Sequence, residues 1–116
     1  MKVTRIYADK DGESRFAELD IPLQDAGEIG ALSELFPVQG IIFRETDSDY
    51  NYSWHNAPCR QFVLMLQGSV EIEVSTGTRR TFHSGDILLV EDTTGRGHVS
   101  RAVNGQPRKT VFVTLA

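Results

Sequence analysis

The sequence predicts an all-β protein folded as an antiparallel sandwich or barrel. Short apolar or alternating runs recur along the 116 residues, and clusters of Gly, Asp, Asn and Pro separate them. Strands spaced this closely, without convincing helices between them, are typical of antiparallel sandwiches and barrels. A chain of this length is expected to form one domain, residues 1–116, around a single core.

Three strands are predicted in the first half of the chain. They cover residues 3–8, 15–21 and 39–46, and the turn-rich sequence Asp9-Lys10-Asp11-Gly12 separates the first two.

The segment between residues 24 and 36 contains two glycines and has weak periodicity, which argues against a long helix. Ser33 is a suitable N-cap for a short turn, and Pro37 would end that turn. We therefore expect helix to be limited to a turn or two near residues 31–36.

The second half has clearer strand signals. Residues 62–66 are apolar on both faces, which predicts a central, covered strand. Val70–Val74 alternates strictly, so it should have one face in water. A turn at Thr76-Gly77 then predicts a hairpin. The remaining strands are predicted at residues 78–82, 86–91, 98–103 and 109–115.

Composition excludes several classes of function. The net charge of −4 argues against a nucleic-acid partner, whose phosphates require a basic surface. No apolar run approaches the roughly 18 residues that span a bilayer, and the N-terminus has no apolar signal-peptide core. The single cysteine, Cys59, cannot form an intrachain disulfide. We expect a small cytoplasmic protein without a nucleic-acid or membrane partner.

Two segments carry the polar residues that a functional site would use. The first runs from Trp54 to Gln61 and closes at Gly68; the second runs from Gly85-Asp86 to Gly97-His98. Together they resemble the two motifs of the cupin superfamily. Anchored on Gly68, the first motif places Gln61 at its glutamate and His55 at its first histidine. Ala57 stands at the second histidine position and Asp49 at the opening glycine.

The second motif is also incomplete. Gly85 matches, Glu91 stands at the proline, His98 arrives two residues late, and Ala102 takes the asparagine position. The resemblance covers roughly residues 38–115. It implies a cupin-type antiparallel jelly-roll β-barrel (a double-stranded β-helix), a fold that often holds a metal at one end.

Strand alternation predicts which of these side chains share a face. His98 shares a face with Ser100, and Gln61 shares one with Val63 and Met65. If these faces and that of His55 point inward, the barrel mouth carries polar groups above an apolar floor. An eight-stranded barrel is about wide enough for one small ligand. The leading hypothesis is therefore a small-molecule-binding domain. Its predicted ligand-binding residues are His55, Gln61, His98 and Ser100.

A metal site built from His55, Gln61 and His98 is the sharper hypothesis. Catalytic zinc usually has three protein ligands, and non-haem iron oxygenases use two histidines and one carboxylate. Gln61 offers only a neutral amide oxygen, so a divalent ion (Fe, Mn, Ni or Zn) would bind weakly unless Glu45 or Glu91 joined. The alternative is that both histidines are hydrogen-bonding pocket residues. The catalytic residues stay unassigned.

Two other function classes remain open at this stage. One is a metal-dependent cupin enzyme, a dioxygenase or isomerase using His55 and His98. The other is a non-catalytic sensory or structural module that acts through its dimer. Three arginines, Arg44, Arg60 and Arg101, would either attract an acidic ligand or simply lie on the surface. The loop at residues 92–94 would either close over a ligand or serve as a plain turn.

A homodimer is expected through the outer sheet face. Phe62, Leu64 and Leu66 lie opposite Gln61, and large exposed apolar patches usually mark an interface. An aromatic stripe of Tyr50, Tyr52 and Trp54 would extend this face. The alternative is that the N-terminal strands fold over the same face within the monomer.

Overall fold

The computed structural model describes residues 1–49 and 51–116. Its strands are β1 (Lys2–Ala8), β2 (Ser14–Asp20), β3 (Gln24–Asp25), β4 (Ala31–Leu32), β5 (Gly40–Thr46), β6 (Asn51–His55), β7 (Gln61–Gln67), β8 (Val70–Val74), β9 (Arg79–Phe82), β10 (Ile87–Val90), β11 (His98–Ala102) and β12 (Arg108–Thr114). A short 3-10 turn, η1, covers Gly27–Ile29. The predicted all-β class is confirmed.

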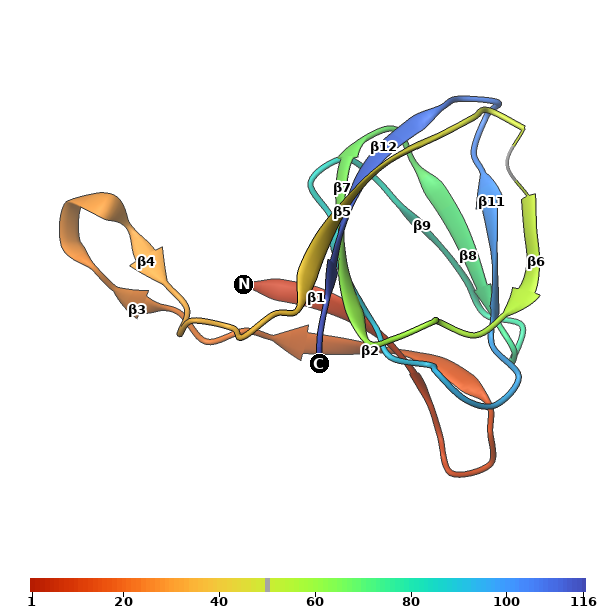
Figure 1. The fold of residues 1–116 in the computed structure, drawn as a ribbon, viewed down its shortest axis with the longest axis horizontal. Helices are drawn as coiled ribbons and strands as arrows, with labels where there is room; N and C mark the ends of the chain where they lie inside the picture. The colour runs from red at the N-terminus through yellow and green to blue at the C-terminus, as the bar shows by residue number, and fades with distance from the viewer. Residues whose placement is uncertain (50) are drawn as a thin grey trace.

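The strands form two main sheets that enclose the core (Figure 1). In the described part of the chain, the six-stranded sheet has the order β2-β1-β10-β7-β12-β5, and the four-stranded sheet has the order β6-β11-β8-β9. Among the described residues no strand pairs across from one sheet to the other, so these strands form two facing sheets and not one closed barrel. The pairing is also not wholly antiparallel, because β1 runs parallel to β10.

Each predicted strand lies within one residue of an observed strand at both ends. The helical turn expected near residues 31–36 is wrong. Ala31 and Leu32 instead pair with Gln24 and Asp25 as a small hairpin, and η1 lies within its loop. Gly27 and Gly30 both have positive φ, which allows the tight reversal. The hydroxyl of Ser33 donates to the carbonyl of Glu34 and caps no helix.

The main core lies between the two sheets, because alternate residues of facing strands point toward each other. Val63 and Met65 of β7 face Val70 and Ile72 of β8 in one apolar cluster. Further members of this cluster are Ile6, Ala57, Val74, Phe82, Leu88 and Val90. The inward assignment of the β7 residues beside Gln61 is therefore correct.

The outer face of the six-stranded sheet carries a second apolar cluster around Phe62 and Leu89. The N-terminal strands β1 and β2 do not fold over this face; they extend the sheet beyond β10 and add Val3 and Leu19 to the cluster. The aromatic stripe expected to extend this face is wrong for its described members, because Tyr52 and Trp54 lie on β6 of the four-stranded sheet. The third member, Tyr50, lies outside the described residues.

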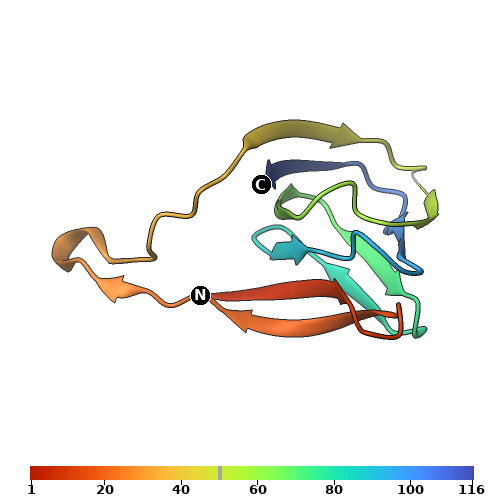
Figure 2. The same ribbon diagram turned by 60° about the horizontal axis from the view of Figure 1, so that its bottom comes forward.

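Residues 22–39, which include β3 and β4, form an arm that projects away from the two sheets (Figures 1 and 2). Its apolar side chains are largely in solvent: Ile29 is 74% exposed and Leu35 is 95% exposed. The arm touches the outer face where the ring of Phe36 packs edge-on against Phe62, with ring centroids 5.6 Å apart. No helix in the described residues is long and apolar enough to cross a membrane.

Candidate functional site

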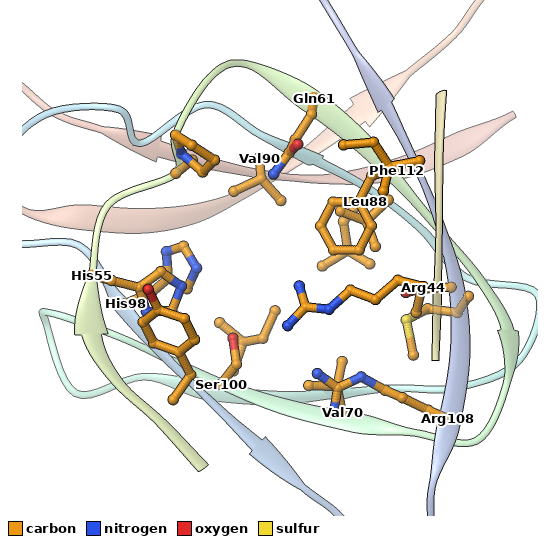
Figure 3. Close-up of a pocket in the computed structure, with 18 of the residues that line it drawn as sticks. Arg44, His55, Gln61, Val70, Leu88, Val90, His98, Ser100, Arg108 and Phe112 are labelled. Carbon is orange, nitrogen blue, oxygen red and sulfur yellow. The ribbon is translucent and has the colours of Figure 1, made fainter. Parts of the chain in front are cut away.

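A cavity of about 330 Å³ opens between the two sheets (Figure 3). Its floor is apolar because the inward positions of the central strands carry aliphatic and aromatic side chains. These are Val63, Met65, Val70, Ile72, Leu88, Val90 and Phe112. All four predicted ligand-binding residues, His55, Gln61, His98 and Ser100, line this same cavity. The polar side chains therefore converge from β6, β7 and β11.

The two histidines are brought together by strand pairing. His55 ends β6 and lies directly opposite His98 at the start of β11. Their ring centroids are 4.4 Å apart, and the ring of Tyr52 lies 3.8 Å from that of His55. In His55, Nδ1 donates to the carbonyl of Ser53 at 2.7 Å, which leaves Nε2 as the acceptor of its neutral ring.

His98 is held by a buried hydrogen-bond chain. Its Nδ1 lies 2.6 Å from Oδ2 of Asp92, and the same oxygen accepts from the hydroxyl of Ser14 at 2.8 Å. Asp92 is 0% exposed. Since a carboxylate oxygen only accepts, Nδ1 of His98 donates this bond, which leaves Nε2 as the acceptor when the ring is neutral. This arrangement fixes both the tautomer and the orientation of the ring.

The loop after β10 is tied to the loop after β6. Asn56 donates its side-chain amide to the carbonyls of Thr94 and Gly95, at 3.0 and 3.1 Å, and the amide of Ala57 donates to the carbonyl of Asp92 at 3.1 Å. At Gly97 the backbones approach so closely that an added Cβ would lie 2.1 Å from the carbonyl oxygen of His55. These contacts hold His55 and His98 at a fixed separation.

Gln61 lies on the facing sheet, at the start of β7. It is buried, and its Oε1 is 3.9 Å from the sulfur of Cys59, a distance that fits a weak S–H hydrogen bond. The two carboxylates considered as additional ligands lie elsewhere. Glu45 lines a separate surface hollow, and Glu91 pairs with Arg5 and Arg60. Neither lines the main cavity.

Of the three arginines considered from the sequence, only Arg44 lines the cavity. Arg60 pairs with Glu91, and Arg101 pairs with Glu73 at 2.9 Å. Sequence reasoning missed Arg108 and Thr110, which also line the cavity. Period-two alternation along residues 108–112 places both on the face of Phe112, so the signal was present. No sequence pattern indicated that Asp92 is buried beside His98, because a polar residue directly after a strand usually belongs to a turn.

The site favours a neutral His55. Burial lowers the pKa of His55 below its ordinary value of 6.5, and the nearby His98 and Arg44 act in the same direction. The hydrogen bond to Ser53 and the charge of Asp92 oppose this shift without cancelling it.

A metal centre fits these residues poorly. The cavity offers two imidazole acceptors and one amide oxygen, and the described residues contain no group of three or more His, Cys, Asp and Glu side chains that could hold a metal. The guanidinium groups of Arg44 and Arg108 share the cavity and would repel a dication (Figure 3). Structural and catalytic sites normally supply at least three ligands.

The sequence matches no protein-family model, and no curated protein matches it. Solved structures are similar in fold. Protein NMB1881 from Neisseria meningitidis aligns with a TM-score of 0.52 at 18% identity, over 66% of this chain and 72% of that one. The conserved SPY1581 protein of unknown function from Streptococcus pyogenes has a TM-score of 0.53 at 16% identity, over 72% of this chain and 70% of that one.

A Cupin 2 conserved barrel domain protein from Salinispora arenicola CNS-205 also has a TM-score of 0.53, at 18% identity. That alignment covers 66% of this chain and 61% of the Salinispora chain, so this chain spans about three fifths of it. At such identities the similarity concerns the fold alone. The chain therefore has the fold of the cupin superfamily.

Proposed function

We propose that this cupin-fold domain binds a small organic molecule in the cavity between its two main sheets. In this proposal the two sheets are the walls of a jelly-roll barrel. One observation carries the proposal: His55, Gln61, His98 and Ser100 come from three strands in two sheets and line one cavity with an apolar floor. Ligand pockets typically have volumes of about 300–1,000 Å³ and combine apolar walls with a few convergent polar groups. The cavity of about 330 Å³ lies at the small end of that range.

Filling the cavity floor should abolish ligand binding. A fragment library screened by amide chemical shifts on ¹⁵N-labelled protein should yield compounds that perturb residues around the cavity. The Val63→Phe variant should lose these responses, because the added ring occupies the floor. Val38→Phe makes the same substitution at an exposed site on the arm and should keep them. Fragments that bind Val63→Phe as well as the parent protein would contradict the proposal.

A metal-dependent dioxygenase or isomerase is the second candidate function. The observation in its favour is the bond between Asp92 and His98, since metal-ligating histidines usually donate their other ring nitrogen to a carboxylate or carbonyl. His55 has the same feature through Ser53. The small number of ligands argues for weak binding at most.

Any divalent ion that binds should require both histidines. We expect weak binding of Fe, Mn, Ni or Zn that the His55→Ala, His98→Ala double variant loses, and a decline in binding as pH falls because protonated imidazole does not coordinate. His83→Ala is the control, since His83 bonds to Ser69 in a turn away from the cavity. Titration calorimetry measures the affinities. Unchanged metal binding by the double variant would exclude this site. Tight, stoichiometric metal binding by the parent protein would instead favour the metal-dependent enzyme over the small-molecule-binding domain.

We also propose a homodimer in which the arm and the outer face of one copy pack against a second copy. Two-residue strands such as β3 and β4 are not stable by themselves, so the arm needs a partner surface. A standard interface uses about 20–30 residues from each partner, which the arm and the adjoining β5 edge can supply. Their exposed apolar residues are Leu23, Ile29, Leu32, Leu35, Phe36, Val38, Ile41, Ile42 and Phe43. Such an assembly would also suit a non-catalytic sensory or structural module.

Charging the arm should separate the copies. Light scattering should give a dimer mass for the parent protein and a monomer mass for the Ile29→Asp, Leu35→Asp variant, because buried carboxylates would be desolvated at the interface. Thr78→Asp adds the same type of charge at an exposed hairpin turn and should leave the dimer intact. A parent protein that stays monomeric at high concentration would rule the dimer out.

A further inference from the structure

We infer that the cavity binds the carboxylate group of a small organic acid through Arg44, Arg108 and Thr110. This inference rests on the proposed binding function and names the chemical class of the ligand. Of these three residues, Arg108 and Thr110 were not among the site residues predicted from the sequence.

Strand register places the three side chains together. Thr110 of β12 lies directly opposite Arg44 of β5. Arg108 lies two residues before Thr110 on the same strand, so it points to the same face and is a diagonal neighbour of Arg44, with Cα atoms about 7–8 Å apart. Figure 3 shows both guanidinium groups extending into the cavity from this wall, toward the side that holds His55 and His98.

The cavity concentrates positive charge. Arg108 is only 7% exposed and Arg44 is half-buried, and no aspartate or glutamate is among the described residues that line the cavity. Charges withdrawn from water interact strongly with an ion of opposite sign that enters the same space. The guanidinium carbon of Arg44 also lies 5.3 Å from the ring centroid of Phe112, which holds the group over the apolar floor.

Thr110 supplies an independent indication of a ligand. Thr110 lines the cavity and is 4% exposed, and its buried Oγ1 has no hydrogen-bond partner among the described residues. Buried side-chain hydroxyls are nearly always hydrogen-bonded. An anion placed between the two arginines would accept a hydrogen bond from this hydroxyl and supply the partner that Oγ1 lacks.

A carboxylate with an apolar body fits this arrangement best. The planar guanidinium fork matches a carboxylate in a two-point interaction, which is among the strongest hydrogen-bonded pairs in proteins. The apolar floor favours a hydrocarbon body, and a cavity of about 330 Å³ limits that body to a few carbons or one ring. On the facing wall, Nε2 of a neutral His98 is an acceptor, so it can bond to a donor group at the other end of the ligand.

The test compares benzoate with its neutral isostere benzamide, using amide chemical shifts of ¹⁵N-labelled protein. Benzoate should perturb residues 108–112 and bind about tenfold or more tightly than benzamide. Arg44→Gln should weaken benzoate on the order of 10- to 100-fold and leave benzamide unchanged. Thr110→Val keeps the shape, removes the hydroxyl, and should weaken benzoate several-fold. Arg101→Gln, whose arginine pairs with Glu73 outside the cavity, should leave both affinities unchanged.

Distinct results would separate this inference from the proposed function. Equal binding of benzamide and benzoate, insensitive to Arg44→Gln and Thr110→Val, would overturn the carboxylate site while the pocket function stands. If inorganic phosphate perturbs residues 108–112 and benzoate does not, the assignment to a carboxylate is also overturned. If neither probe nor any fragment of the screen perturbs the cavity, both proposals are wrong.

Discussion

Replacing Asp92 with alanine should lower the free energy of unfolding by about 3 kcal/mol, because two buried donors lose a charged acceptor. The carboxylate accepts from Ser14 at 2.8 Å and from His98 at 2.6 Å, and water cannot easily replace it in a position that is 0% exposed. The ring of His98 should also lose its fixed orientation. The residue therefore contributes both to the stability of the fold and to the geometry of the cavity.

Urea denaturation of the parent and variant proteins measures this effect. Asp20→Ala is the matched control, since Asp20 is 79% exposed and its one ion pair in the described part of the chain is with the N-terminus; its loss should cost less than about 1 kcal/mol. A double-mutant cycle with Ser14→Ala should show coupling between the two residues, as expected within one hydrogen-bond network. If Asp92→Ala lowers the free energy of unfolding no more than Asp20→Ala does, the hydrogen bonds of Asp92 do not stabilise the native state.

Gly97→Ala should be the most damaging single-methyl change near the site. Gly97 has a φ of 78°, where a side chain alone costs about 1–3 kcal/mol. The new Cβ would in addition lie 2.1 Å from the carbonyl oxygen of His55, so the backbone of one loop must move. We expect a loss of stability above that range and a changed separation of His55 and His98.

Gly77→Ala provides the control for backbone conformation. Gly77 has a φ of 91°, and nothing lies within 4 Å of its added Cβ, so this variant measures the conformational cost without the contact. Thermal unfolding and the imidazole NMR signals of both variants give the comparison. If both variants lose the same stability and the histidine signals of Gly97→Ala are unchanged, the close approach to His55 has no energetic role.

Most strand positions could be predicted because their signals are local. The alternation in Val70–Val74 and the glycine at residue 68 lie within a few residues of the elements that they define. The arm was not predictable in this way: residues 31–32 pair with residues 24–25 around two glycines, and nothing nearby shows that their apolar side chains remain exposed.

The histidine positions followed from motif spacing, but their surroundings did not. Asp92 and His98 are six residues apart, and the remaining partner, Ser14, is separated from Asp92 by 78 residues. The pairing of Arg44 with the wall formed by Arg108 and Thr110 depends on the register between β5 and β12. Such relationships arise from sheet topology, which a single sequence with degenerate motifs does not specify.

The parallel pairing of β1 with β10 has a consequence for the order of folding. β1 and β2 are adjacent in sequence and can form a hairpin as soon as they leave the ribosome, whereas Thr4 must wait for Leu88 to be synthesised. Until then one edge of β1 presents unpaired backbone groups, the kind of edge that favours pairing with other chains. Closure of so long a loop slows folding. The N-terminal hairpin thus presents an open strand edge during synthesis, and pairing of β1 with β10 removes that edge.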